Sequence, residues 1–200
     1  MTTTDCDEAS RTAPLALWRY GHDYLRAARE LCAKHHLRCD ESQAPYHLAA
    51  QGIEFALLAF LRSRGASMES LRGQIAHSLA AALARCEALG MPTLPEPLRP
   101  VIGEIAACHR DGQFVHLHAS GEAFPDIDPL VEAGVWVLDR VAPDVAAHYV
   151  AHLGGAESPT VDEFVRRMRA DLCATAERAA VADPGVRACG VTVSNAAAPN

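Results

Sequence analysis

The apolar residues of segment 46–63 recur at the spacing of one helix face, and this periodicity is the strongest constraint on the fold. They occupy positions i, i+4, i+7 and i+8 of a helical pattern. The stripe consists of Ile53, Leu57, Phe60 and Leu61. Phe55 and Leu58 widen it beyond a single face. A helix that is apolar on several faces is buried on several sides, so we predict that this helix lies at the centre of the fold.

Five other segments also have the composition and periodicity of helices. They lie at about residues 15–36, 67–89, 98–109, 129–152 and 160–180. The segment "FVHLH" at residues 114–118 could form a short extended piece, but only inside a loop. The sequence therefore predicts an all-α fold, an up-and-down helical bundle of about five to six helices.

Local signals indicate where these helices begin and end. Gly65 and Gly90 suit helix stops, and Ser67 suits the N-cap of the third helix. Thr160, followed three residues later by a glutamate, has the spacing of a capping box. Pro143 is expected to kink or break the helix in which it lies, because proline lacks the N–H that a helix interior requires.

Interruptions of the helical pattern divide the chain into four regions. Residues 1–13 are predicted to be a disordered N-terminus, and residues 14–153 a helical bundle domain. Residues 154–182 are predicted to hold a linker and an additional C-terminal helix. Residues 183–200, rich in small residues, are predicted to be a loose tail.

Composition and charge exclude several classes of function. The net charge of −7 argues against broad, non-specific binding of nucleic acid. No apolar run is long enough to span a membrane and the N-terminus does not resemble a signal peptide, so we predict a cytoplasmic protein without a membrane partner. The seven cysteines are scattered without a CxxC pair, so no disulfide framework is expected.

The segment "CAKHHLRC" contains four side chains of the types that bind zinc. Cys32, His35, His36 and Cys39 fall at i, i+3, i+4 and i+7 of a helix face. Such a set spans about 10 Å, whereas zinc ligands must converge within about 2.3 Å of one point. Two of the four could bind a metal only with ligands from elsewhere in the chain. They remain weak metal candidates, and we predict no metal and no cofactor.

The third predicted helix, residues 67–89, contains an arginine and a histidine, Arg72 and His77. On a helical wheel its apolar stripe lies on one face, and His77 lies on the opposite face. The residues around His77 are small: Gly73, Ala80, Ala81, Ala84 and Ala88. A solvent face usually carries charged or amide side chains, so this face is expected to contact another helix, either of this chain or of a second copy.

Arg72 and His77 together suit the cleavage of phosphodiesters. Histidine can act as general acid or base near neutral pH, and arginine can stabilise the negative charge of the transition state. In one regular helix, however, positions i and i+5 point about 140° apart, so the two side chains would not converge. They could meet if Arg72 lay outside the regular helix or if a second chain completed the site. An unreactive, hydrogen-bonded packing histidine is the alternative.

Residues 46–90 resemble the central part of HEPN-like helical proteins. Those proteins have a helix of the form "A-x-x-I-E-x-x-L-K-A-F-L", then a glycine, a short turn and a helix containing "G-H-D-L". Here "AAQGIEFALLAFL", Gly65 and "AHSL" occupy these places, with a leucine instead of the lysine. The resemblance is weaker over the rest of residues 15–150.

This resemblance implies an up-and-down bundle that often forms homodimers. In active members it also implies metal-independent endoribonuclease activity through an R-x4–6-H motif, which Arg72 and His77 match. His77 would then be the general acid or base and Arg72 the phosphate clamp. We therefore expect an RNA-associated or regulatory binding module of the toxin–antitoxin or defence type. The alternative is a structural or protein-partner-binding bundle without nucleic-acid chemistry.

Overall fold

The structure is a computed structural model that describes residues 13–35, 43–74, 78–110, 127–153 and 159–182. Seven α-helices, and no strand, occur within these ranges. The helices are α2 (Pro14–His35), α3 (Ala44–Ser63), α4 (Met68–Gln74), α5 (Leu79–Ala88), α6 (Arg99–Arg110), α7 (Ile127–Leu153) and α8 (Val161–Ala182). The prediction of an all-α helical bundle is confirmed.

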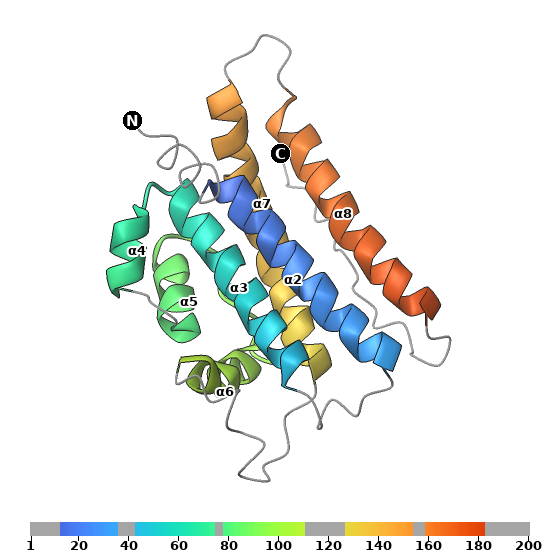
Figure 1. The fold of residues 1–200 in the computed structure, drawn as a ribbon. Coiled ribbons are helices and arrows are strands. Elements are labelled where there is room, and N and C mark those ends of the chain that lie inside the picture. Colours follow the sequence, from blue (N-terminus) through green and yellow to red (C-terminus); the bar gives the residue numbers. More distant parts are fainter. Residues whose placement is uncertain (1–12, 36–42, 75–77, 111–126, 154–158, 183–200) are drawn as a thin grey trace, which may run out of the picture.

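Four long helices, α2, α3, α7 and α8, lie side by side, and α4, α5 and α6 flank α3 (Figure 1). The most extensive packing joins α2 to α3, followed by α3 to α7. No helix among the described residues is long and apolar enough to cross a membrane.

Helix α3 is the centre of the fold, as its wide apolar stripe predicts. The four residues of that stripe are at most 1% exposed. Helices α2, α5, α6 and α7 all pack against α3. Phe55 and Leu58, which widen the stripe, are only partly buried. One side of the central helix therefore contributes apolar side chains to the protein surface.

Three glycines allow α2, α3 and α7 to approach closely around Leu25. A Cβ atom on Gly52 of α3 would lie 2.8 Å from Leu25 Cγ, and one on Gly134 of α7 would lie 2.6 Å from both Leu25 methyl carbons. A Cβ atom on Gly21 of α2 would lie 2.8 Å from the Gly52 carbonyl oxygen. Real Cβ atoms essentially never come this close. Gly21 and Gly52 each face backbone atoms of the other helix, which cannot move aside, whereas at Gly134 the neighbouring Leu25 methyl groups could shift.

Most of the predicted helix ends are confirmed. Gly65 and Gly90 have φ values of +88° and +95°, a left-handed conformation that glycine adopts easily. The Ser67 hydroxyl accepts a hydrogen bond from the Ser70 amide at 3.1 Å, just before α4. At the start of α8, the Thr160 amide donates to Glu163 Oε2 at 2.9 Å, and the Glu163 amide donates to Thr160 Oγ1 at 3.3 Å. This is the predicted capping box.

The prediction of one continuous helix at residues 67–89 is wrong. Helix α4 ends at Gln74 and α5 begins at Leu79. Between them Ser78 has an extended backbone (φ −107°, ψ 94°), and its hydroxyl accepts a hydrogen bond from the Ala81 amide at 3.3 Å. Serine competes with the helix by capping backbone N–H groups, so Ser78 begins a new helix. With this division, the described ranges contain seven helices, compared with the five to six expected for the chain.

Pro143 does not break α7, which is continuous through it. The proline ring is exposed, on the outer side of the helix.

Helix α8 packs against α7: Arg169 Nε donates to Asp139 Oδ1 at 2.7 Å, and the rings of Tyr149 and Phe164 stack with centroids 4.8 Å apart. The additional C-terminal helix is thus part of the bundle. The predicted N-terminal region up to residue 12, the linker at 154–158 and the tail at 183–200 lie outside the described residues.

Candidate functional site

Arg72 and His77, the candidate catalytic pair, lie largely outside the described part of the chain. Arg72 belongs to α4, although its side chain is outside the described part, and His77 lies outside the described residues altogether. The structure therefore does not test whether the two side chains converge.

The small-residue face predicted around His77 is partly described on α5. Ala80, Ala81, Ala84 and Ala88 are all exposed. Within the described part of the chain, no helix covers these four alanines. The expected contact with another helix of this chain is therefore absent there, and a second copy remains the proposed contact.

The four weak metal candidates are only partly described. Cys32 is half-buried and packs against the core, as a small apolar residue would. His35 is the last residue of α2, with its side chain outside the described part, and His36 and Cys39 lie outside the described residues. Among the described side chains, no three or more His, Cys, Asp or Glu residues group closely enough to hold a metal ion.

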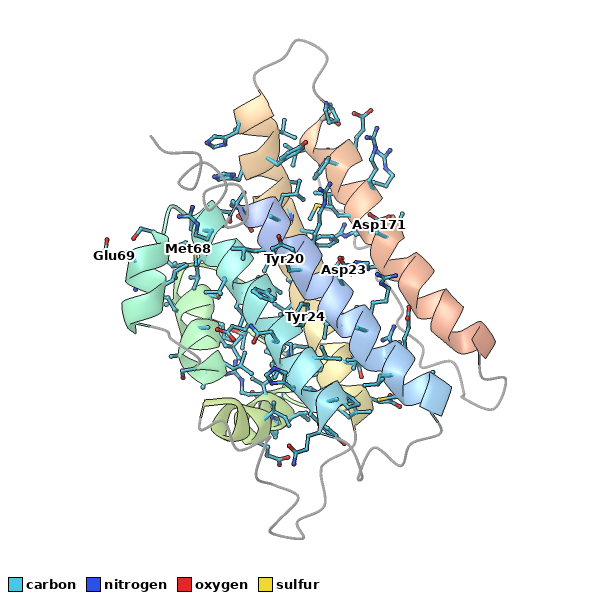
Figure 2. The ribbon with its side chains drawn as sticks, viewed as in Figure 1. Tyr20, Asp23, Tyr24, Met68, Glu69 and Asp171 are labelled. Atoms are coloured by element: carbon cyan, nitrogen blue, oxygen red, sulfur yellow. The ribbon has the colours of Figure 1, made fainter. Side chains whose placement is uncertain are left out.

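An aromatic cluster lies on the surface where α2 meets α3. The Tyr24 ring meets the Phe55 ring edge-on with centroids 5.3 Å apart, and the Tyr20 ring is tilted against Phe55 at 5.8 Å. Tyr20 is 40% exposed, and Tyr24 and Phe55 are partly exposed. Figure 2 shows Tyr20 and Tyr24 on the front of α2, with Asp23 beside them. We call Tyr20, Tyr24 and Phe55 the aromatic patch.

Charges of both signs border the aromatic patch on α2. Arg26 Nη2 lies 3.3 Å from Asp23 Oδ1, and Arg26 Nη1 lies 3.9 Å from Glu30 Oε1. These side chains are about half exposed, so the ion pairs contribute little to stability. They place charged groups of both signs beside the two tyrosines along α2, and polar residues commonly border the apolar centre of a protein contact surface.

Two histidines and an arginine come together at the end of α7. The rings of His148 and His152 stack with centroids 4.1 Å apart at an angle of 18°. Burial is the first cause that lowers the pKa of His148, followed by the nearby His152 and the Arg62 guanidinium of α3. Arg62 itself donates to the Ala66 carbonyl oxygen at 2.6 Å. The i, i+4 spacing of the two histidines in a predicted helix was a signal in the sequence that reasoning from motifs missed.

An ion pair next to this cluster joins the C-cap residue of α3, Arg64, to α7. Arg64 Nη2 lies 2.6 Å from Asp144 Oδ1, one helical turn before His148. The Arg64 guanidinium also lies over the Phe60 ring, 5.1 Å from its centroid. The carboxylate nearest to the histidines along α7 is thus already engaged with an arginine.

The described residues also form a shallow depression between α2, α7 and α8. Its walls are mainly apolar, with His22, Arg26 and Arg29 contributed by α2. It is open to solvent and too small to enclose a ligand. The aromatic patch and the histidine cluster are therefore the more informative surfaces.

Comparison with protein-family models, with curated proteins and with solved structures gave no match. Two surfaces of the described residues are therefore the basis for a functional proposal: the aromatic patch on α2 and α3, and the two stacked histidines on α7.

Proposed function

We propose that this chain is a HEPN-like α-helical binding module that acts as a homodimer and is RNA-associated or regulatory. The observation that carries the proposal is the aromatic patch. Tyrosine and phenylalanine are enriched at the centres of protein interfaces, since they bury a large area with little loss of conformational entropy. Tyr20 is 40% exposed and Tyr24 and Phe55 are partly exposed, whereas Trp18, Tyr46 and Phe60 are buried in the core.

The rim of the patch favours a second copy of the chain as the partner. In a two-fold symmetric contact the same surface meets itself, so its charges must be self-complementary. Asp23 and Arg26 provide one charge of each sign on the same helix. When two copies of α2 pack antiparallel, the aspartate of one can meet the arginine of the other while the tyrosines pack between them.

The oligomeric state in solution tests this proposal. We expect the wild-type chain to elute as a dimer in size-exclusion chromatography with light scattering, and Tyr20→Ser to shift it towards monomer. Arg19→Ser is the matched control, because Arg19 is an exposed neighbour on α2 outside the patch. A wild-type chain that is monomeric at all concentrations, or a Tyr20→Ser variant that remains dimeric, would contradict the proposal.

Metal-independent endoribonuclease activity is the second candidate function. The observation that favours it is the extended backbone of Ser78, because the segment that contains the R-x4-H motif is then not one continuous helix into α5. In this proposal His77 transfers the proton and Arg72 stabilises the phosphate charge. A second copy, held through the aromatic patch or the exposed alanines of α5, would complete the site.

RNA cleavage in the presence of EDTA tests the second candidate. We expect His77→Ala to abolish cleavage and the control His47→Ala, at an exposed position of α3, to retain it. Equal cleavage by the wild type and His77→Ala would exclude this pair. If the wild type neither binds nor cleaves RNA, the competing proposal of a protein-partner-binding bundle is the one supported.

A further inference from the structure

The side chains of His148 and His152 project from one face of α7 in its last two turns. Residues four apart on a helix are neighbours, and these two rings are stacked with centroids 4.1 Å apart. Imidazole nitrogen is a preferred ligand of zinc, copper and nickel, and two imidazoles on adjacent turns can chelate one such ion. The spacing therefore matches a bidentate site.

A hydrogen bond determines which nitrogen of His152 is free to bind. His152 Nδ1 lies 2.6 Å from the carbonyl oxygen of His148. A carbonyl oxygen can only accept, so Nδ1 carries the proton and donates, and Nε2 of the neutral ring has a lone pair. Metal-binding histidines are usually oriented in this way, by a hydrogen bond from the nitrogen that does not bind the metal.

His148 is suited to the same role. Its surroundings disfavour the charged imidazolium form, since burial, the adjacent ring of His152 and the Arg62 guanidinium all lower its pKa. A neutral imidazole is the form that binds metals, so a lowered pKa favours metal binding at this ring. The rings are 18° from parallel, so with His152 held by its hydrogen bond it is the His148 ring that must turn about χ2 to direct its lone pair towards an ion at about 2.0–2.1 Å from both rings.

Near the two histidines, some charges favour a bound cation and others oppose it. The C-terminal end of α7 carries the negative end of the helix dipole, which favours a cation within the last turn. Arg62 opposes a cation. Asp144, one turn earlier, is held by Arg64 at 2.6 Å and is engaged away from the pair.

We propose that His148 and His152 form a bidentate site for a divalent transition-metal ion of the zinc class, with water completing the coordination. This proposal goes beyond the binding function proposed above and does not depend on it. Binding would close a ring between successive turns at the end of α7 and stabilise the turn from which the chain leads towards α8.

Zinc titration of the full-length chain against a chromophoric chelator tests the site. The remaining histidines and cysteines can bind zinc elsewhere, so the comparison is between variants. We expect His148→Ala and His152→Ala each to bind one equivalent of zinc fewer than the wild type, or to bind that equivalent at least about tenfold more weakly. A tenfold loss of affinity corresponds to about 1.4 kcal/mol of binding free energy. The control His47→Ala, which removes an exposed histidine of α3, should bind as many equivalents as the wild type.

Two further measurements separate chelation from binding by a single ring. Zinc should raise the melting temperature of the wild type but not of His152→Ala, whose exposed side chain can be removed without a cavity. Arg62→Gln should bind zinc more tightly, because the opposing charge is gone. Should His148→Ala not fold, His148→Gln takes its place. Full zinc binding by either histidine variant would overturn the proposal, since a chelate requires both rings.

Discussion

Gly21 and Gly52 face each other where α2 crosses α3, each against the backbone of the other. A Cβ atom on Gly21 would lie 2.8 Å from the Gly52 carbonyl oxygen, and one on Gly52 would lie 3.0 Å from the Gly21 carbonyl oxygen. Because backbone atoms cannot move aside as a flexible side chain can, the distance between the two helices depends on both glycines. The aromatic patch lies across the same helix pair, so this crossing also sets the spacing of its rings.

Substitution of Gly52 by alanine should therefore destabilise the protein. Forcing one extra carbon into a packed interface costs about 1–3 kcal/mol. The matched control is Gly103→Ala in α6, where a Cβ atom meets nothing within 4 Å. The unfolding free energy of Gly103→Ala should equal that of the wild type or exceed it by about 0.5–1 kcal/mol, because alanine has a higher helix propensity than glycine. Urea unfolding measures both, and equal effects of the two changes would show that the crossing is not tightly packed.

Trp18 connects α2 to the interior of α7. Its indole Nε1 donates to the Leu138 carbonyl oxygen at 3.0 Å, and the side chain is 2% exposed. We expect Trp18→Phe to lower the free energy of unfolding by about 1–3 kcal/mol, through loss of the hydrogen bond and of packing volume. Trp136→Phe, at a partly exposed position of α7, should cost less in the same thermal or urea unfolding experiment. A larger loss of unfolding free energy for Trp136→Phe than for Trp18→Phe would contradict the buried, hydrogen-bonded position of Trp18.

Glu87 connects the proline-rich stretch after α5 to the bundle. Its Oε1 atom accepts from the Leu94 amide at 3.0 Å and from Arg99 Nη2 at 2.6 Å. Glu87→Ala would leave the Leu94 amide without this acceptor, so we expect a loss of about 1–3 kcal/mol in unfolding free energy and faster proteolysis of the stretch. Glu96→Ala, at an exposed position of the same stretch, should change stability by less than about 0.5 kcal/mol.

Cys86 should be chemically inert in the folded protein. Burial, and secondarily the charge of Glu87, raise the pKa of its thiol from 9.0 to about 12, and its Sγ donates to the Leu57 carbonyl oxygen at 3.5 Å. Only the thiolate reacts readily with iodoacetamide. Peptide mapping after brief alkylation at pH 8 should find Cys173, which is exposed, modified before Cys86. Equal labelling of the two cysteines would contradict the buried position.

The raised pKa of the Cys86 thiol also predicts how the free energy of unfolding changes with pH above about 9. The unfolded thiol loses its proton near pH 9, whereas the folded thiol keeps it to about pH 12. The stabilisation by the protonated thiol is thus complete below pH 9 and is lost as pH rises towards 12, at up to about 1.4 kcal/mol per pH unit. Cys86→Ala removes this contribution, so its unfolding free energy should fall less steeply with pH over this range than that of the wild type.

The sequence by itself determined the helical class, the central position of α3 and most helix ends. These features depend on local physics, namely the period of 3.6 residues, the capping box at Thr160 and the left-handed glycines Gly65 and Gly90. The division at Ser78 was missed because the apolar pattern continues across it, and only the described backbone reveals the extended residue that begins α5.

Only the tertiary structure decided which residues from distant segments meet. Gly21 and Gly52 are ordinary helix residues until two helices cross at them, and Tyr20 and Phe55 become one surface only after that crossing. The spacing of His148 and His152 was visible in the sequence, but the hydrogen bond to the His148 carbonyl and the approach of Arg62 were not. The periodicity of apolar residues specifies which face of a helix is buried. Which other helix covers that face depends on the packing of the whole chain.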